Sequence, residues 1–155
     1  MTDDEFAAVS GRWCASYAQH LAPVRGLSAD EATRVARAEF DQQLPERTHT
    51  AGQLLFTAVD DEGAAVGRVW LSAVSPDGAE GAWVSELEVD HERRGNGYGR
   101  QIMTLAEDVC LERGITKLRL NVFGSNIIAR RLYESLGYSV LFQKMAKDLA
   151  SPRSL

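Results

Sequence analysis

The feature that most constrains this chain is a glycine-rich stretch that lies between a strand-like run and a helical run. Residues 93–100 read RRGNGYGR, with the strand-like run at residues 83–89 and the helical run at residues 101–113. Three glycines at alternate positions leave little side-chain bulk, so a ligand can approach the backbone, and they tolerate the positive φ angles of a tight loop. The following helix directs its unpaired N–H groups and the positive end of its dipole at this loop, and three arginines add positive charge. The sequence therefore predicts a loop that binds a pyrophosphate.

The spacing of the glycines separates this loop from two other nucleotide-binding motifs. The dinucleotide fingerprint needs G-x-G-x-x-G, and the P-loop ends in Gly-Lys followed by Ser or Thr, whereas here the glycines run G-x-G-x-G. Residues 94–99 instead resemble R/Q-x-x-G-x-G/A, the acyl-CoA pyrophosphate loop of the GNAT superfamily of N-acetyltransferases. A glycine-rich turn before a helix is weak evidence by itself, so the resemblance depends on residues nearer the C-terminus.

A second signature of the same superfamily lies further along the chain. Residues 121–126 read NVFGSN, residues 132–134 read LYE, and residues 137–138 read GY. This is similar to the family pattern of an asparagine, a helix that carries Leu-Tyr-Glu, and a closing Gly-Phe or Gly-Tyr. Two signatures in the same order and spacing are far more specific than either alone, and the resemblance extends more weakly to the N-terminal half.

The resemblance implies an α/β (α+β) fold of the GNAT type. Such a fold has a central mixed, mostly antiparallel sheet of six or seven strands, splayed between the strands at residues 83–89 and 117–122, with about four helices. The periodicity predicts a last strand at residues 138–145 and a bulge at Gly67. Members usually begin with a strand before the first helix, but this chain starts almost directly in helix, so that strand is either missing or replaced by the chain ends.

Composition limits the class of protein and its partners. At 155 residues the chain suits one domain, predicted at residues 1–149 with a disordered tail at residues 150–155. A net charge of −5 argues against nucleic acid, whose binding normally needs a basic face. No apolar run approaches the roughly 20 residues of a membrane helix, and the acidic start is unlike a signal peptide, so a cytoplasmic protein is expected. The two cysteines and three histidines lack ligand spacing, so no metal is predicted.

The resemblance names acetyl-CoA as the co-substrate, bound in the V between the splayed strands. Main-chain groups of Leu87, Glu88 and Val89 would hold the pantetheine arm, and Asn126 would contact it through its amide or a water. Backbone N–H groups of the loop would hold the pyrophosphate, and the loop residues are Arg94, Gly95, Asn96, Gly97, Tyr98, Gly99 and Arg100.

The transfer of an acetyl group to an amine needs a base and an acid. A lysine-like amine, with a pKa near 10.4, is neutral in only about one molecule in a few thousand at pH 7, so its proton must be removed before it attacks. Glu86 and Glu88 share one face of their strand and are both candidates; Glu86 is preferred because relatives often place an acidic residue three positions before Val89. The alternative is that both are solvated or paired with arginines. Tyr133, which the resemblance puts beside the thioester sulfur, is predicted to protonate the departing thiolate.

The predicted activity is acetyl-CoA-dependent N-acetylation of a primary amine, on a small molecule, by direct attack in a ternary complex. Two alternatives stay open: a protein acetyltransferase that acts on an N-terminus or a lysine, and a non-catalytic CoA-binding sensor. Ribosomal-protein alanine acetyltransferases place a catalytic glutamate at the position of Asn121, which cannot act as a base, and this weakens that interpretation. Dimerisation is common among members, and the sequence leaves open whether this chain forms a homodimer.

Overall fold

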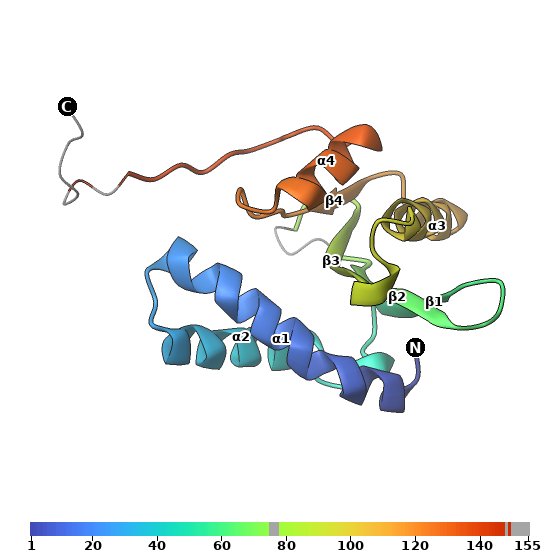
Figure 1. The fold of residues 1–155 in the computed structure, drawn as a ribbon, viewed down its shortest axis with the longest axis horizontal. Coiled ribbons are helices and arrows are strands. Elements are labelled where there is room, and N and C mark those ends of the chain that lie inside the picture. Colours follow the sequence, from blue (N-terminus) through green and yellow to red (C-terminus); the bar gives the residue numbers. More distant parts are fainter. Residues whose placement is uncertain (75–77, 148, 150–155) are drawn as a thin grey trace. The chain divides into compact units, whose positions relative to one another are not determined.

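The computed structural model describes residues 1–74, 78–147 and 149, so the tail predicted at residues 150–155 lies outside the described residues. The chain divides into two compact units, Met1–Phe123 and Gly124–Leu155 (Figure 1). The first unit contains α1 (Asp3–Arg25), α2 (Ala29–Gln43), β1 (Gln53–Val59), β2 (Ala65–Ser72), β3 (Ala82–Val89), α3 (Tyr98–Glu112) and β4 (Leu118–Leu120), and the second contains α4 (Ile127–Ser135). In the described part of the chain, no helix is both long and apolar enough to cross a membrane.

The first two helices begin at capping boxes. Ser28 accepts a hydrogen bond from the backbone N–H of Glu31 at 3.3 Å, and the carboxylate of Glu31 accepts one from the backbone N–H of Ser28 at 2.9 Å. Thr2 and Glu5 repeat this arrangement at the start of α1. Each box satisfies N–H groups that have no acceptor within the helix, which fixes where the helix begins.

The four strands form one mixed sheet in the order β1-β2-β3-β4. The first three are antiparallel neighbours, and β4 lies parallel to β3 because α3 connects the two strands. The α/β class and the mostly antiparallel sheet are therefore confirmed. Four strands are fewer than the six or seven expected: among the described residues no strand precedes α1, and β1 lies at the edge of the sheet.

The strand predicted at residues 138–145 did not form. Residues 138–145 carry no strand, and Val140, Leu141 and Phe142 are exposed. A strand needs a neighbour to accept its backbone hydrogen bonds, and the described residues of the second unit contain a helix but no strand. The alternation of apolar residues predicted a strand, but periodicity alone does not supply a partner.

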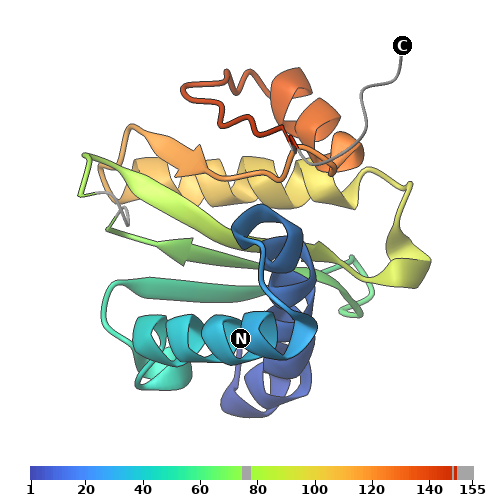
Figure 2. The same cartoon turned by 90° about the vertical axis from the view of Figure 1, so that its left-hand side faces the viewer.

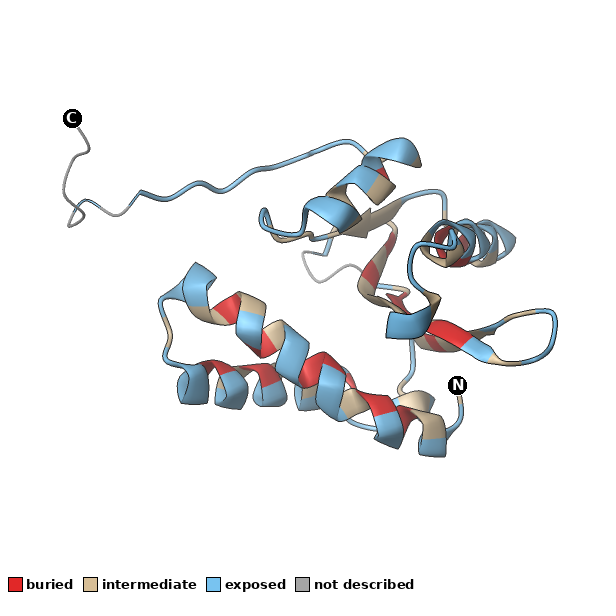
Figure 3. Ribbon diagram, in the orientation of Figure 1, coloured by how far each residue is buried: buried red, intermediate tan, exposed pale blue. Residues whose placement is uncertain are grey.

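Helices cover both faces of the sheet within the first unit. On one face α1 and α2 pack against β1 and β2, and Trp13 of α1 stacks on Trp70 of β2 with ring centroids 6.4 Å apart. On the other face lies α3, with Ile102 above β2. Figures 1 and 2 show this arrangement from two directions, and Figure 3 shows that the buried residues of α1 follow one side of the helix.

Gly67 of β2 serves the packing of α3. A Cβ at Gly67 would lie 2.5 Å from the backbone oxygen of Glu88 and 2.7 Å from Cδ1 of Ile102. The bulge predicted at Gly67 falls one residue earlier, because Ala58 pairs with Gly67 and the next pair is Val59 with Ala65. The glycine is therefore needed for the close approach of a helix.

Candidate active site

The sheet opens beside β3, the strand that leads into the glycine-rich loop. Parallel pairing with β4 covers only the first three residues of β3, Ala82 to Val84, against Leu118 to Leu120. Beyond this point β3 continues to Val89 with no partner on that side among the described residues of the first unit. The predicted splay between these two strands is therefore present, and it leaves a stretch of main chain with one open edge.

The hydrogen-bond pattern identifies which backbone groups face that open edge. Asp90 donates its N–H to the oxygen of Val66 on β2 at 3.0 Å. Because N–H and C=O groups alternate along a strand, the groups of Glu88 also face β2, whereas those of Leu87 and Val89 face the open edge. Of the three residues predicted to hold pantetheine through the main chain, these two have the required direction.

A bulge at Ser85 sets the direction of the two glutamates. Trp70 of β2 pairs with Glu86 and Leu71 of β2 pairs with Val84, so Ser85 has no partner on β2. Trp70 stacks on α1, and its pairing therefore places Glu86 on the face that α1 covers. Glu88, two residues later, lies on the same face.

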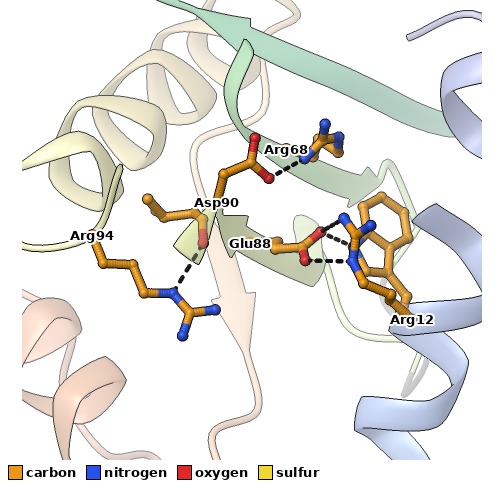
Figure 4. A network of polar contacts seen from close by, with 7 residues as sticks. Arg12, Arg68, Glu88, Asp90 and Arg94 are labelled. Atoms are coloured by element: carbon orange, nitrogen blue, oxygen red, sulfur yellow. Dashed lines mark hydrogen bonds and ion pairs between the residues drawn. The ribbon is translucent and has the colours of Figure 1, made fainter. Parts of the chain in front are cut away.

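Glu88 is held by α1 through three hydrogen bonds. Arg12 donates from Nε to Oε1 at 3.2 Å and from its terminal Nη2 to Oε2 at 3.3 Å, and Trp13 donates its indole N–H to Oε2 at 2.8 Å. Figure 4 shows Arg12 facing the carboxylate of Glu88, with dashed lines marking these contacts. Of the alternatives that the sequence left open, pairing with an arginine is the one observed for Glu88.

Glu86 lies in surroundings that oppose its ionisation. Burial among protein atoms, followed by the negative charge of Glu88, raises the pKa of Glu86 from 4.5 to about 7, while the backbone N–H of Leu87 acts in the opposite direction. The side chain nevertheless keeps some exposed area. A carboxyl with a pKa near neutrality can accept a proton from an amine and release it again.

The glycine-rich loop has the backbone conformation that its sequence predicted at two positions. Gly95 and Gly97 have φ angles of 79° and 82°, and the described residues leave the space beside both Cα atoms open. Gly97 is the N-cap of α3, which therefore begins at Tyr98, before the predicted start at residue 101. Tyr98 and Gly99 thus belong to the first turn of the helix, whose N–H groups have no intrahelical acceptor.

Side chains of the loop shape its backbone. Arg94 donates from Nε to the oxygen of Val89 at 3.0 Å, which fills part of the open edge of β3 (Figure 4). Asn96 donates its amide to the oxygens of Arg93 and Arg94, both at 3.2 Å. The backbone N–H of Arg100 already donates to the oxygen of Gly97 at 3.1 Å, so an anion would compete for it.

The second unit contains the two remaining predicted residues. Asn126 caps α4, because its Oδ1 accepts a hydrogen bond from the backbone N–H of Ala129 at 3.1 Å. Tyr133 is the buried residue of α4, and its ring lies 5.8 Å from that of Tyr138. Asn126 therefore retains its amide N–H₂ group as the part of the side chain suited to a ligand.

Two residues of α1, Arg12 and Trp13, complete this region: helical spacing marks Trp13 as part of an apolar stripe, but the sequence does not predict that either residue binds Glu88. They precede Glu88 by 76 and 75 positions, and no local pattern marks these two contacts. Among the described residues, no cluster of three or more His, Cys, Asp or Glu side chains could hold a metal ion.

Comparison with known proteins identifies the class. Residues 21–138 match the sequence model of the acetyltransferase (GNAT) family. This match includes the splayed strand β3, the glycine-rich loop and α4. The chain belongs to the GNAT family of acetyltransferases.

Its relatives specify the class further. The uncharacterized N-acetyltransferase YycN of Bacillus subtilis is 26% identical over 149 residues, which are 96% of each chain. A crystal structure of YycN matches with a TM-score of 0.89 and covers 97% of this chain and 96% of its own. The mycothiol acetyltransferase of Beutenbergia cavernae is 34% identical over 126 residues, which are 80% of this chain but 38% of that protein. The protein is an N-acetyltransferase.

Proposed function

We propose that the protein transfers an acetyl group from acetyl-CoA to the primary amine of a small molecule, by direct attack in a ternary complex. The observation that carries this proposal is the position of Glu86, a carboxyl with a pKa of about 7 on the strand that has an open edge. In a GNAT family member, a carboxyl at this position is a candidate base beside the main chain that would bind the acyl donor.

The first unit offers a binding surface for an acyl-CoA. The main-chain groups of Leu87 and the N–H of Val89 would bind the pantetheine arm as an added strand, since an extended amide chain can pair with an open strand edge. The carbonyl oxygen of Val89 already accepts a hydrogen bond from Arg94, so the pantetheine would compete for it. The N–H groups of Tyr98 and Gly99, the first turn of α3, suit the pyrophosphate because the positive end of the helix dipole lies there. The bound acetyl-CoA would supply the activated acyl group.

Glu86 would remove the proton from the amine, directly or through a water. A carboxyl whose pKa is raised to about 7 can take a proton from the amine and return it to solvent near neutral pH. Glu88 is a poorer base, because Arg12 and Trp13 occupy its oxygens. These contacts favour Glu86 over Glu88 as the base.

Tyr133 and Asn126 would act from the second unit. The phenol of Tyr133 would give a proton to the departing thiolate, and the amide of Asn126 would bind the pantetheine. Both roles rest on the family signature, in which these residues stand on and before the Leu-Tyr-Glu helix.

A small-molecule amine is the favoured acceptor. The relative named mycothiol acetyltransferase supports this choice, since its name refers to a small thiol rather than a protein. Acetylation of a peptide N-terminus or lysine is the alternative.

The release of CoA thiol from acetyl-CoA tests the proposal. The wild-type protein and Glu86→Gln are assayed against polyamines, aminoglycosides, amino acids and short peptides with free amines. Turnover confined to one class of small amine, reduced about 100-fold or more in Glu86→Gln, is expected. Turnover on peptides alone would replace the proposed acceptor, and tight binding of acetyl-CoA without any turnover would favour a CoA-binding sensor.

A further inference from the structure

We propose that Glu88 is a positioning residue: α1 holds its carboxylate on the face of β3 that carries Glu86, and this neighbouring charge influences how readily Glu86 takes up a proton. The inference rests on the proposed function only in that Glu86 is the base. In this proposal α1 contributes to the chemistry through Arg12 and Trp13, whose side chains need not contact either substrate.

The contacts of Glu88 with α1 hold its carboxylate in one position. Arg12 donates from two nitrogens of its planar guanidinium, one to each oxygen, and Trp13 adds a third donor. Hydrogen bonds from a guanidinium to a carboxylate are among the strongest between side chains, and two of them fix the orientation of the carboxylate. The side chain of Glu88 is 18% exposed, whereas that of Arg12 is 54% exposed, so water screens the cation more than the anion.

The position of Glu88 brings this charge to bear on Glu86. The two residues are separated by one position in β3 and share the face covered by α1. A negative neighbour on the same face disfavours a second negative charge. Burial is the larger cause of the raised pKa of Glu86, and the charge of Glu88 is the second.

Other charged and titratable groups on the elements around this face have partners of their own. Arg68 of β2 binds Asp90 at 2.5 Å (Figure 4). Arg25 of α1 and the phenol of Tyr17 both bind Glu39 of α2, at 2.7 and 2.8 Å. Burial, and then that hydrogen bond, raises the pKa of Tyr17 to about 12, so it stays neutral.

Two other titratable groups of α1, His20 and Cys14, have contacts of their own. His20 contacts the backbone oxygen of Ser16 and stacks on the ring of Phe123. Cys14 is buried against α2. Of these charged groups, Glu88 is therefore the one whose charge we expect to influence the pKa of Glu86.

Two substitutions should move the proton affinity of Glu86 in opposite directions. Glu88→Gln removes the negative charge and keeps an oxygen that can accept from Trp13, so the pKa of Glu86 falls. Arg12→Gln removes the positive charge that partly offsets Glu88, so the pKa of Glu86 rises. We expect shifts on the order of one pH unit, larger for Glu88→Gln because Arg12 is more exposed.

The test is an infrared titration of the full-length protein without substrates. The absorbance of the protonated carboxyl is followed against pH in the wild type, Glu88→Gln and Arg12→Gln, and Glu86→Gln identifies the part of the signal that belongs to Glu86. Circular dichroism at each pH confirms that each variant is folded. The same variants are then assayed for kcat/KM against pH.

The outcomes separate this inference from the proposed function. Opposite shifts of the Glu86 midpoint support it, and a role of Glu88 that is only structural predicts no shift in either variant. An unmoved midpoint, or shifts in the same direction, would overturn it. Infrared midpoints that move as expected while the kcat/KM profile stays fixed would uphold the control of Glu86 by Glu88 and reject Glu86 as the base.

Discussion

The environment of Glu86 favours its neutral form, and this makes the stability of the protein depend on pH. In the folded protein its pKa is about 7, above the value of 4.5 expected for an exposed glutamate. Between these two pH values the folded state binds more protons than the unfolded state, so the free energy of unfolding falls as pH rises. The contribution of Glu86 to stability is present below about pH 4.5 and is lost as pH rises through 7.

Replacing Glu86 by glutamine should therefore stabilise the protein at alkaline pH. Glutamine has nearly the same shape and no charge to bury, so Glu86→Gln is expected to raise the free energy of unfolding by about 1–3 kcal/mol at pH 9 and to leave it nearly unchanged at pH 5. Urea unfolding at both pH values measures the difference. Glu62→Gln, an exposed carboxyl in the turn after β1, is the matched control and should change stability by less than about 0.5 kcal/mol at either pH. Equal effects of Glu86→Gln at the two pH values would contradict the raised pKa.

Glu88 shows why residue roles in this region could be predicted only in part. Strand periodicity placed Glu86 and Glu88 on one face, and the strand pairing agrees with this. The sequence did not distinguish a base from an ion pair, because the arginine that decides the question lies 76 residues away on another element. Contacts of that span depend on how α1 crosses the sheet, which no local pattern encodes.

For the secondary-structure elements, short-range sequence patterns predicted those features that depend only on neighbouring residues. The glycines at residues 95 and 97 have the positive φ angles expected of a tight loop. The start of α3 was predicted three residues late, because Gly97 acts as the N-cap and Tyr98 and Gly99 join the helix. The strand predicted at residues 138–145 did not form, since strand formation depends on a partner rather than on the segment itself.

The packing of α3 on the sheet should depend on Gly67. Gly67→Ala would place a methyl group against the oxygen of Glu88 and the end of Ile102, and the backbone atom cannot move aside without disturbing the pairing of β2 with β3. We expect a loss of about 1–3 kcal/mol in the free energy of unfolding, measured in urea.

Gly11 provides the control for this substitution. It lies within α1 with no atom of the described residues within 4 Å of an added Cβ. Gly11→Ala should stabilise the protein by about 0.5–1 kcal/mol, because alanine favours the helix. If Gly67→Ala were also neutral or stabilising, α3 would not pack as closely on β2 as described.

For the whole molecule, the proposed reaction draws on both compact units. Glu86, the open edge of β3 and the glycine-rich loop belong to Met1–Phe123, whereas Asn126 and Tyr133 belong to Gly124–Leu155. The two signatures in the sequence correspond to these two groups of residues. Because the proposed roles of Asn126 and Tyr133 differ, binding of acetyl-CoA and proton transfer to the leaving group should be separable by substitution within the second unit.

Tyr133→Phe tests that separation. The phenyl ring preserves the packing of Tyr133 with Tyr138 but has no proton to give the thiolate, so turnover should fall about 100-fold while the Kd for acetyl-CoA stays nearly unchanged. Stopped-flow release of CoA thiol and calorimetric binding of acetyl-CoA measure the two quantities. Tyr138→Phe removes the neighbouring hydroxyl from the same pair of rings and should alter neither, which controls for general disturbance of the second unit. Unchanged turnover in Tyr133→Phe would remove Tyr133 from the acid role, and a parallel loss of binding would make it a binding residue instead.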